Sequence, residues 1–310
     1  RITAEPALDE VLEIIEMARQ AGADSVVGIG GGSVLDTAKV VACFVNSKQQ
    51  VADCFGTGLI KERGLWCGCL PTTSGTGSEV TCFAVISNPD EGRKYPLAEE
   101  ELLPDEAILD EVLVKSVPAA VTADTGMDVM THAIEAYVST ENNEFSGALA
   151  EKAVEITGQF LIRSYTSCDD THARRKMHIA SCLAGLAFNS ASLGLNHGMA
   201  HQLGAHFHIP HGKANAILLP YIIEYNSEID MHSRSRSVYA PCVRKYCNMA
   251  RTLGVFNLNE ITTVRALVSY IQFMNKEMNI PLSVSACGEN GIALLPSSFL
   301  IADPLRWALR

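Results

Sequence analysis

Hydrophobic positions in the first third of the chain follow two alternating patterns. Leu8, Val11 and Ile15 recur at helical spacing within residues 6–21, and Gly22 ends this run. Short apolar runs typical of buried strands follow, with a second helical pattern after the first of them. The predicted strands are 25–29, 65–70, 81–87 and 107–109, and the second helix is 33–44. Strands that alternate with helices predict an α/β layer with a mostly parallel sheet.

Beyond Pro118 the pattern changes, and long helical periods follow one another with few β-branched runs between them. The predicted helices are 123–139, 146–164, 174–193, 199–205, 214–226 and 238–253. We therefore expect two domains, one of residues 1–117 and an all-α one of residues 118–310, with the boundary at Val117 and Pro118.

Composition narrows the class of protein. With 310 residues, 47% of them hydrophobic, the chain can bury a substantial core. The 24 basic residues against 35 acidic ones give a net charge of -11, which argues against nucleic acid or an anionic membrane as the main partner. None of the ten cysteines forms a CxxC pair, so we expect reduced thiols in a cytoplasmic protein rather than a cysteine-rich zinc site.

A glycine-rich turn at 28–33, Gly-Ile-Gly-Gly-Gly-Ser, joins a predicted strand to a predicted helix. Glycines let the backbone approach a ligand closely, and free N–H groups at a helix start attract anions. Ser33 can also cap the helix. A pyrophosphate site and a tight turn without a ligand both stay open, because Asp53, at the distance typical of an acidic ribose partner, follows no convincing strand.

A second loop of small and hydroxyl-bearing residues spans 71–79, directly after the strand predicted at 65–70. Hydroxyls and exposed amides at the carboxyl end of a strand suit phosphate and ribose oxygens. A polar surface loop is the alternative. Two such loops at successive strand ends favour a nucleotide site.

Histidine is concentrated in one short segment. Five of the nine histidines lie within 197–211, and His211 begins a predicted helix after Pro210. Asp128 and His132, four residues apart, share one face of an earlier predicted helix. One carboxylate and three neutral imidazoles suit Fe(II), Zn(II) or another first-row metal. Spacing alone leaves open which three histidines bind.

Together these segments resemble the iron-containing (group III) alcohol dehydrogenase family. The resemblance rests on GIGGGSVLDTAK at 28–39, PTTSGTGSEVT at 71–81, DTGMDVMTHAIEAY at 124–137 and HGMAHQLGAHFHIPHGKANAILLP at 197–220, and it covers roughly residues 5–255. It implies an α/β N-terminal dinucleotide-binding (Rossmann-like) domain followed by an all-α metal-binding domain, with the site in the cleft between them.

The resemblance also implies roles for individual residues. The metal ligands would be Asp128, His132, His197 and His211, and His201 would lie beside the metal as a catalytic residue that helps proton transfer. The cofactor would be held by Gly31, Gly32, Ser33, Asp36, Thr72, Thr73, Thr81, Phe83 and Lys94.

The implied reaction is hydride transfer between NAD(P) and an alcohol or aldehyde, assisted by a metal acting as a Lewis acid. The metal would be Fe(II), with Zn(II) as the alternative, and NAD and NADP both stay open. The segment around His211 is most similar to the branch acting on short primary alcohols such as ethanol and propanol. A polyol dehydrogenase on the same scaffold and a catalytically silent metal-binding fragment are the alternatives. Family members are commonly dimers or larger, so we expect a homo-oligomer.

Two stretches depart from the family pattern. The usual first strand–helix–strand unit is missing, so the dinucleotide-binding domain is expected to be incomplete at its start. From about Pro281 onward the sequence matches the usual helical end poorly.

Overall fold

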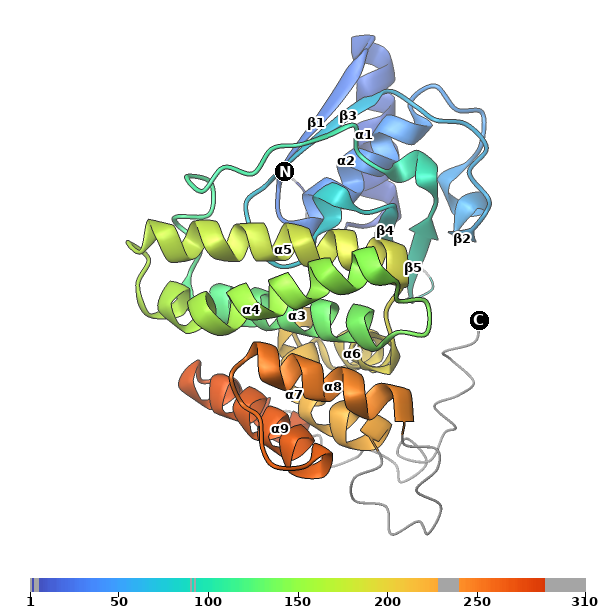
Figure 1. Cartoon of the computed structure of the whole chain (residues 1–310). Helices are drawn as coiled ribbons and strands as arrows, with labels where there is room; N and C mark the ends of the chain where they lie inside the picture. The colour runs from blue at the N-terminus through green and yellow to red at the C-terminus, as the bar shows by residue number, and fades with distance from the viewer. Residues whose placement is uncertain (1, 3–5, 90, 92, 228–239, 288–310) are drawn as a thin grey trace.

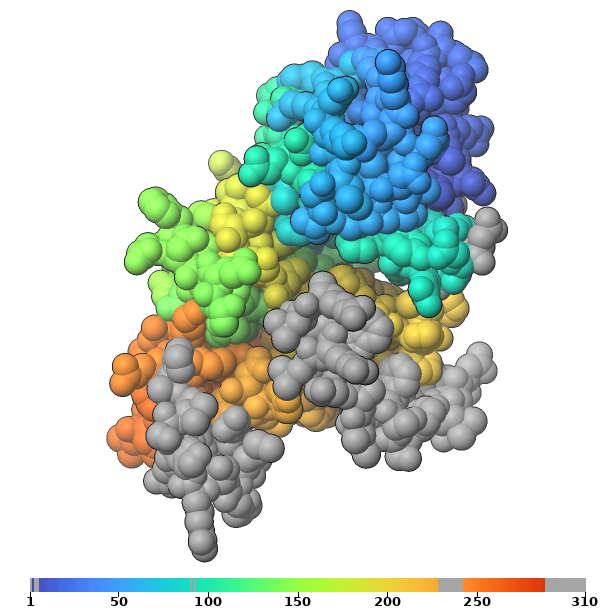
Figure 2. All heavy atoms as spheres, turned by 90° about the vertical axis from the view of Figure 1, so that its right-hand side faces the viewer, coloured from blue at the N-terminus to red at the C-terminus, as the bar shows by residue number. Residues whose placement is uncertain are grey.

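The structure is a computed structural model that describes residues 2, 6–89, 91, 93–227 and 240–287. Figure 1 shows the strands gathered at one end of the molecule, above a stack of long helices. The view turned by 90° gives the same order, with the blue and cyan N-terminal part over the green to orange helical part (Figure 2). The N-terminal part with the strands is the sheet half, and the part built from long helices is the helical half.

A small parallel sheet forms the outer layer of the sheet half. Its strands are β1 (Ser25–Gly30), β3 (Trp66–Pro71) and β6 (Glu106–Ala107), in the order β1-β3-β6. Helix α1 (Leu8–Ala21) ends at Gly22 in the left-handed region, and α2 (Gly32–Phe44) follows β1. These elements confirm the predicted alternation. Because Gly30 pairs with Pro71, the glycine-rich turn and the second loop leave the sheet at the same edge.

The sheet is less uniformly parallel than predicted. Strand β4 (Phe83–Asn88) pairs antiparallel with β5 (Arg93–Ala98), and β2 (Gly56–Thr57) joins β5 to make a separate three-stranded sheet. The expectation of one mostly parallel sheet was therefore wrong for 81–87. Strand β5 begins with Arg93 and Lys94 and contains Pro96, so it lacks the apolar run that identifies a buried strand.

Long helices build the helical half, as predicted. They are α3 (Ala119–Val138), α4 (Glu144–Thr166), α5 (Thr171–Ala191), α6 (Leu195–Phe207), α7 (His211–Ser227), α8 (Ala240–Thr252) and α9 (Glu260–Glu277). The last of these was not predicted, although Val264, Leu267 and Ile271 follow helical spacing. No single described helix is long and apolar enough to span a membrane; α5 and α6 meet that test only as a pair bent by 109°.

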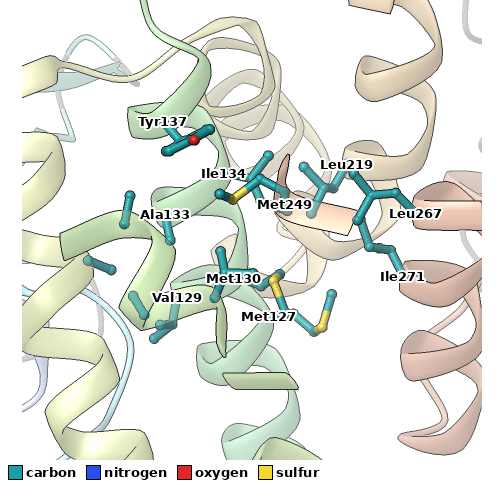
Figure 3. Packing of buried hydrophobic residues seen from close by; sticks show 14 of the residues in the cluster. Met127, Val129, Met130, Ala133, Ile134, Tyr137, Leu219, Met249, Leu267 and Ile271 are labelled. Atoms are coloured by element: carbon teal, nitrogen blue, oxygen red, sulfur yellow. The ribbon is translucent and has the colours of Figure 1, made fainter. Parts of the chain in front are cut away.

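Helix α3 lies at the centre of the helical half. Met127, Met130 and Ile134 from α3 pack with Leu219 from α7 and Leu267 from α9 (Figure 3). All five side chains are 0–1% exposed. Since α3 is enclosed on nearly every side, its polar residues are buried too, and each needs a partner.

The segment that leads into α3 is tied to α5. Arg174, only 4% exposed, donates hydrogen bonds to the carbonyls of Val114 (2.9 Å) and Val117 (3.0 Å). The division of the chain at Val117 and Pro118 stays a prediction.

Candidate metal and nucleotide site

Helices α3 and α6 bring three of the predicted metal ligands together. Asp128, His132 and His197 each place one ligand atom within 4.8 Å of the others. All three are buried, with exposed fractions of 3–4%. Residues four apart share one side of a helix, which is why Asp128 and His132 of α3 face the same point. The N-terminal turn of α6 supplies His197.

The fourth predicted ligand lies at the edge of this group. His211 begins α7, and its Nε2 is 3.7 Å from Asp128 Oδ1. Its side chain is 39% exposed, whereas that of Asp128 is 4% exposed. His201 stacks on His211 with 5.0 Å between ring centroids and 24° between the planes. The structure therefore gathers His201 and all four predicted ligands.

Burial and mutual attraction set the protonation of the cluster. Burial lowers the pKa of His132 to about 3. Protein atoms around the rings of His211 and His201, together with the neighbouring histidines, lower the pKa of these two residues as well. Burial alone would raise the pKa of Asp128, but the surrounding histidines hold it well below its usual range. An ionised carboxylate therefore lies among the neutral imidazoles of His132, His201 and His211 at neutral pH. Burial alone would lower the pKa of His197, but attraction to Glu135 and Asp128 raises it to about 9.

Two buried residues that the sequence analysis did not select complete the cluster. Asn215 directs its side-chain Nδ2 at Asp128 Oδ1 (2.7 Å), His197 Nε2 (3.1 Å) and His211 Nε2 (3.1 Å). Glu135 lies one turn beyond His132 on the same side of α3 and contacts His197. Glu135 could have been selected from the sequence, because it follows His132 by three residues and therefore lies on the same side of the helix.

The donor set fits a divalent first-row metal. One carboxylate oxygen and several imidazole nitrogens converge in a buried space, and these are the atoms that Fe(II) and Zn(II) accept. Nδ1 of His132 makes no hydrogen bond among the described residues, although the backbone of Gly75 is near enough to raise the His132 pKa slightly against the effect of burial. A cation would neutralise the buried charge and occupy these lone pairs.

The two predicted nucleotide loops touch each other. A Cβ built on Gly32 would lie 2.7 Å from Cγ2 of Thr76, and one on Gly31 would lie 3.5 Å from Oγ1 of Thr73. The Thr72 N–H donates to the Gly30 carbonyl at 2.9 Å. Gly32 accordingly has no room for a side chain. The predicted residues Gly31, Gly32, Ser33, Thr72 and Thr73 thus form one patch of backbone and hydroxyl groups at the start of α2.

The other predicted cofactor residues divide into two groups. Lys94 lies close enough to His201 and His211 for its charge to lower their pKa values. Asp36, however, is already engaged by the protein, since its carboxylate accepts from Ser78 Oγ and the Val85 N–H. Thr81 and Phe83 offer their carbonyls to the buried amine of Lys39.

Comparison with known proteins decides the family. The family model "Iron-containing alcohol dehydrogenase" matches residues 1–111, and the model "Fe-containing alcohol dehydrogenase family, C-terminal" matches residues 122–291. The chain belongs to the iron-containing alcohol dehydrogenase family. The C-terminal match reaches 291, well beyond the resemblance to 255 recognised from motifs.

Individual relatives agree. The chain is 45% identical over 280 residues to the 1-propanol dehydrogenase PduQ of Citrobacter freundii, covering 90% of this chain and 70% of that protein. A solved 1,3-propanediol oxidoreductase superposes with a TM-score of 0.88 at 29% identity, covering 99% of this chain and 76% of that one. Sulfoacetaldehyde reductase from Bifidobacterium kashiwanohense in complex with NAD+ gives a TM-score of 0.84 at 30% identity, covering 100% and 76%.

These relatives confirm the predicted activity and fold. The protein is an alcohol and aldehyde oxidoreductase that uses NAD(P), built from an α/β half and an all-α half. The family supports iron, and the NAD+ complex of one relative supports NAD. Its substrate is a small molecule.

Proposed function

We propose that this protein transfers hydride between NAD and a short primary alcohol or aldehyde of the ethanol or propanol type. Fe(II) would be held by Asp128, His132, His197 and His211. The observation that carries the proposal is that the buried residues Asp128, His132 and His197 place ligand atoms within 4.8 Å of one another. His211 Nε2 lies beside them, 3.7 Å from Asp128 Oδ1. A donor set of this kind serves neither packing nor solubility.

The chain's own residues would bind and orient the cofactor. The start of α2 suits a pyrophosphate because the N-terminus of a helix attracts anions, and Gly31 and Gly32 allow the ligand to approach the backbone. The positive charge of Lys94 lies toward the histidines and would hold the nicotinamide end of the cofactor near them. Asp36 would act indirectly, by fixing the Ser78 hydroxyl and the Val85 backbone N–H.

His201 is the proposed proton-transfer residue. It stacks on His211, and its surroundings lower its pKa, so its imidazole is neutral and can accept a proton. When bound, the metal supplies Lewis acidity that eases loss of the alcohol proton. Neutral His201 would then pass this proton toward solvent while His132 and His197, both buried, exclude water from the reacting carbon.

The short primary alcohol is preferred over a polyol because the relative that is 45% identical over 280 residues is a 1-propanol dehydrogenase. One structural relative is a 1,3-propanediol oxidoreductase, so a polyol is the second candidate. We further propose NAD over NADP, Zn(II) as a possible substitute metal, a homodimer or larger assembly, and a cytoplasmic location.

The test is anaerobic reconstitution of metal-free protein with Fe(II) or Zn(II). Oxidation of NADH and NADPH is then assayed with propanal and with glycerol-derived aldehydes. The reverse reaction, reduction of NAD+ and NADP+, is assayed with 1,3-propanediol. We expect metal-dependent turnover, fastest with propanal and NADH. A preference for the polyol would replace the substrate assignment. Metal binding without turnover on any of them would instead identify a silent metal-binding protein.

A matched pair of variants tests the ligand assignment. His211→Ala should lose bound metal and turnover together, because His211 faces Asp128 at the site. His206→Ala is the control, since His206 lies on α6 with its side chain exposed and belongs to none of the proposed sets. Equal metal content in His211→Ala and wild type would refute the ligand set.

A further inference from the structure

We propose that Glu135 is a positioning residue that fixes both the ring of His197 and the start of the helix that carries it. The inference rests on the proposed metal site and adds the residue that holds its α6 ligand in place. Glu135 belongs to α3, it is 4% exposed, and it accepts hydrogen bonds from Asn196 and His197 of α6.

The carboxylate of Glu135 binds one side chain and two backbone groups. Its Oε2 lies 2.5 Å from His197 Nδ1, and its Oε1 accepts the Asn196 N–H at 2.7 Å. The His197 N–H also points to Oε2, at 3.4 Å. A buried carboxylate that accepts hydrogen bonds from N–H groups on both oxygens is held rigidly. The position of Glu135 on α3 therefore fixes the orientation of the His197 ring.

The backbone contacts cap α6 from outside its own sequence. The first N–H groups of a helix lack partners within the helix. Here the residue at the N-cap is Gly194, which has no side chain to supply one. Glu135 takes over that role across space, and its negative charge suits the positive end of the helix dipole.

Gly194 explains how the carboxylate reaches this position. A Cβ built on Gly194 would lie 2.8 Å from Glu135 Oε1, closer than real side chains approach. Any larger residue at 194 would therefore push the carboxylate away from Asn196 and His197. The glycine and the glutamate, 59 positions apart in sequence, act as one unit.

The hydrogen bond to Nδ1 determines which nitrogen faces the metal ligands. A histidine must lose one ring proton to bind a metal. With the remaining proton held on Nδ1 by Glu135, the lone pair is on Nε2, which lies 3.1 Å from the Asn215 amide. Asn196 donates to Asn215 Oδ1 at 2.8 Å and so turns the Asn215 NH2 group toward Nε2 and Asp128. Carboxylate partners of this kind fix the tautomer of a ligating histidine and raise its basicity.

The experiment compares Glu135→Gln, Gly194→Ala and the control Glu151→Gln with wild type. Glutamine keeps the shape of the side chain but offers one acceptor and one NH2 group to a place that contains only N–H donors. Glu151, on α4, also accepts a short hydrogen bond, from the Tyr137 hydroxyl at 2.6 Å, but it lies outside the histidine cluster. The dissociation constants for Zn(II) and Co(II) are measured by chelator competition, and folding is checked by circular dichroism and NAD+ binding.

We expect Glu135→Gln to weaken metal binding about 10- to 100-fold. Gly194→Ala should weaken it less, because the carboxylate is displaced but still present, and Glu151→Gln should leave it unchanged. Proton NMR of the Zn(II)-loaded proteins separates positioning from general support. A hydrogen-bonded Nδ1–H resonance of His197 should be present in wild type and lost or strongly shifted in Glu135→Gln.

The outcomes distinguish this inference from the proposed function. If wild-type protein binds no metal, the proposed function fails. If wild type binds metal and folded Glu135→Gln binds it equally well with an unchanged Nδ1–H resonance, only the role of Glu135 fails. The same holds if Glu151→Gln weakens binding as much as Glu135→Gln does.

Discussion

Two helices of this protein each carry an aspartate followed within about one turn by a basic side chain, and the aspartate is half-buried in the first helix and buried in the second. In α2 the pair is Asp36 and Lys39, and in α3 it is Asp128 and His132. The spacing is similar, and both pairs lie where a helix contacts the rest of its half. They differ in what surrounds them, and that difference separates a structural pair from a functional one.

The α2 pair is saturated by its own chain. The amine of Lys39, 0% exposed, donates to the carbonyls of Ser78 (3.0 Å), Thr81 (3.1 Å) and Phe83, and lies 3.5 Å from Asp36. An ammonium has three protons, and here each has an acceptor. No capacity is left for a ligand, so this pair anchors β4 and the preceding turn to α2.

The α3 pair has an excess of acceptors. The Asp128 carboxylate faces ring nitrogens of His197 and His211, and the Asn215 amide donates a hydrogen bond to it at 2.7 Å. Burial drives His132 to its neutral form instead of letting it pair as a cation. Buried acceptors without enough donors are costly to the fold, and such arrangements are typical of metal sites.

The largest effect is expected at the acceptor-rich pair. Asp128→Asn keeps the hydrogen bond from Asn215 but removes the only carboxylate of the proposed ligand set. Loss of a metal's Lewis acidity is worth several kcal/mol, so kcat/KM for propanal and NADH should fall by about 10³-fold or more. Bound metal, measured by mass spectrometry, should fall with it. A variant that retains metal and a tenth of the activity would contradict this reading.

The saturated pair should show the opposite pattern. Lys39→Met leaves three carbonyls and Asp36 without their cation, and the free energy of unfolding should drop by roughly 3 kcal/mol. Metal content per folded molecule should stay at the wild-type level, because α3, α6 and α7 are untouched. Urea unfolding and metal analysis on the same samples check both. Loss of metal at unchanged stability would overturn the distinction.

A smaller, pH-dependent effect is expected at Glu79, next to the saturated pair. Glu79 is 2% exposed, and burial raises its pKa to about 7 despite the nearby Lys39. Because its pKa is raised from 4.5 to about 7, Glu79 binds more protons in the folded state than in the unfolded state between these two pH values. The free energy of unfolding of wild type should therefore decrease as pH rises through that window. Glu79→Gln, which does not ionise, should gain about 2 kcal/mol relative to wild type between pH 5 and pH 8. Equal pH profiles of unfolding would rule this out.

The smallest effect is expected for a pair of the same spacing at the surface. Lys152 and Glu155 lie three residues apart on α4 at 2.8 Å, but their side chains are 54% and 36% exposed. Water and salt screen such pairs, so Lys152→Met should change the free energy of unfolding by less than about 0.5 kcal/mol. It is the matched control for Lys39→Met. A loss as large as that of Lys39→Met would show that spacing, not burial, sets the cost.

Much of this fold is visible in the sequence because local periodicity and tertiary role coincide. β1 and β3 are apolar runs, and α3 has the helical period and carries two ligand types at one-turn spacing. β5 was missed because a strand held by its hairpin partner needs no apolar run of its own. Its Lys94 was nevertheless named as a cofactor residue, because the family resemblance implied it.

The site shows a sharper limit. The ligand types could be selected because imidazole is rare and was clustered in 197–211. The direction in which a side chain points could not be predicted. Asp36, for example, belongs to a predicted nucleotide-binding motif, yet its carboxylate faces Ser78 and Val85. Glu135 became meaningful only once α6 was seen to start beside it. Helix packing determines which residues that are far apart in sequence meet in the structure, and a local sequence pattern does not show this.

The hydrogen bonds from Arg174 to the segment before α3 affect where the chain can bend. The sheet holds the chain as far as Ile108, whose N–H donates to the Cys69 carbonyl at 2.9 Å, and α5 holds it again from Val114. If the halves rock against each other during turnover, the pivot of the covalent link falls within 109–113. There the Val112 side chain is 70% exposed, and its hydrogen bonds are local ones, such as that from its N–H to Asp110 Oδ1 at 2.9 Å. A rigid substitution such as Val112→Pro would be the most direct way to stiffen that joint without touching either ligand set.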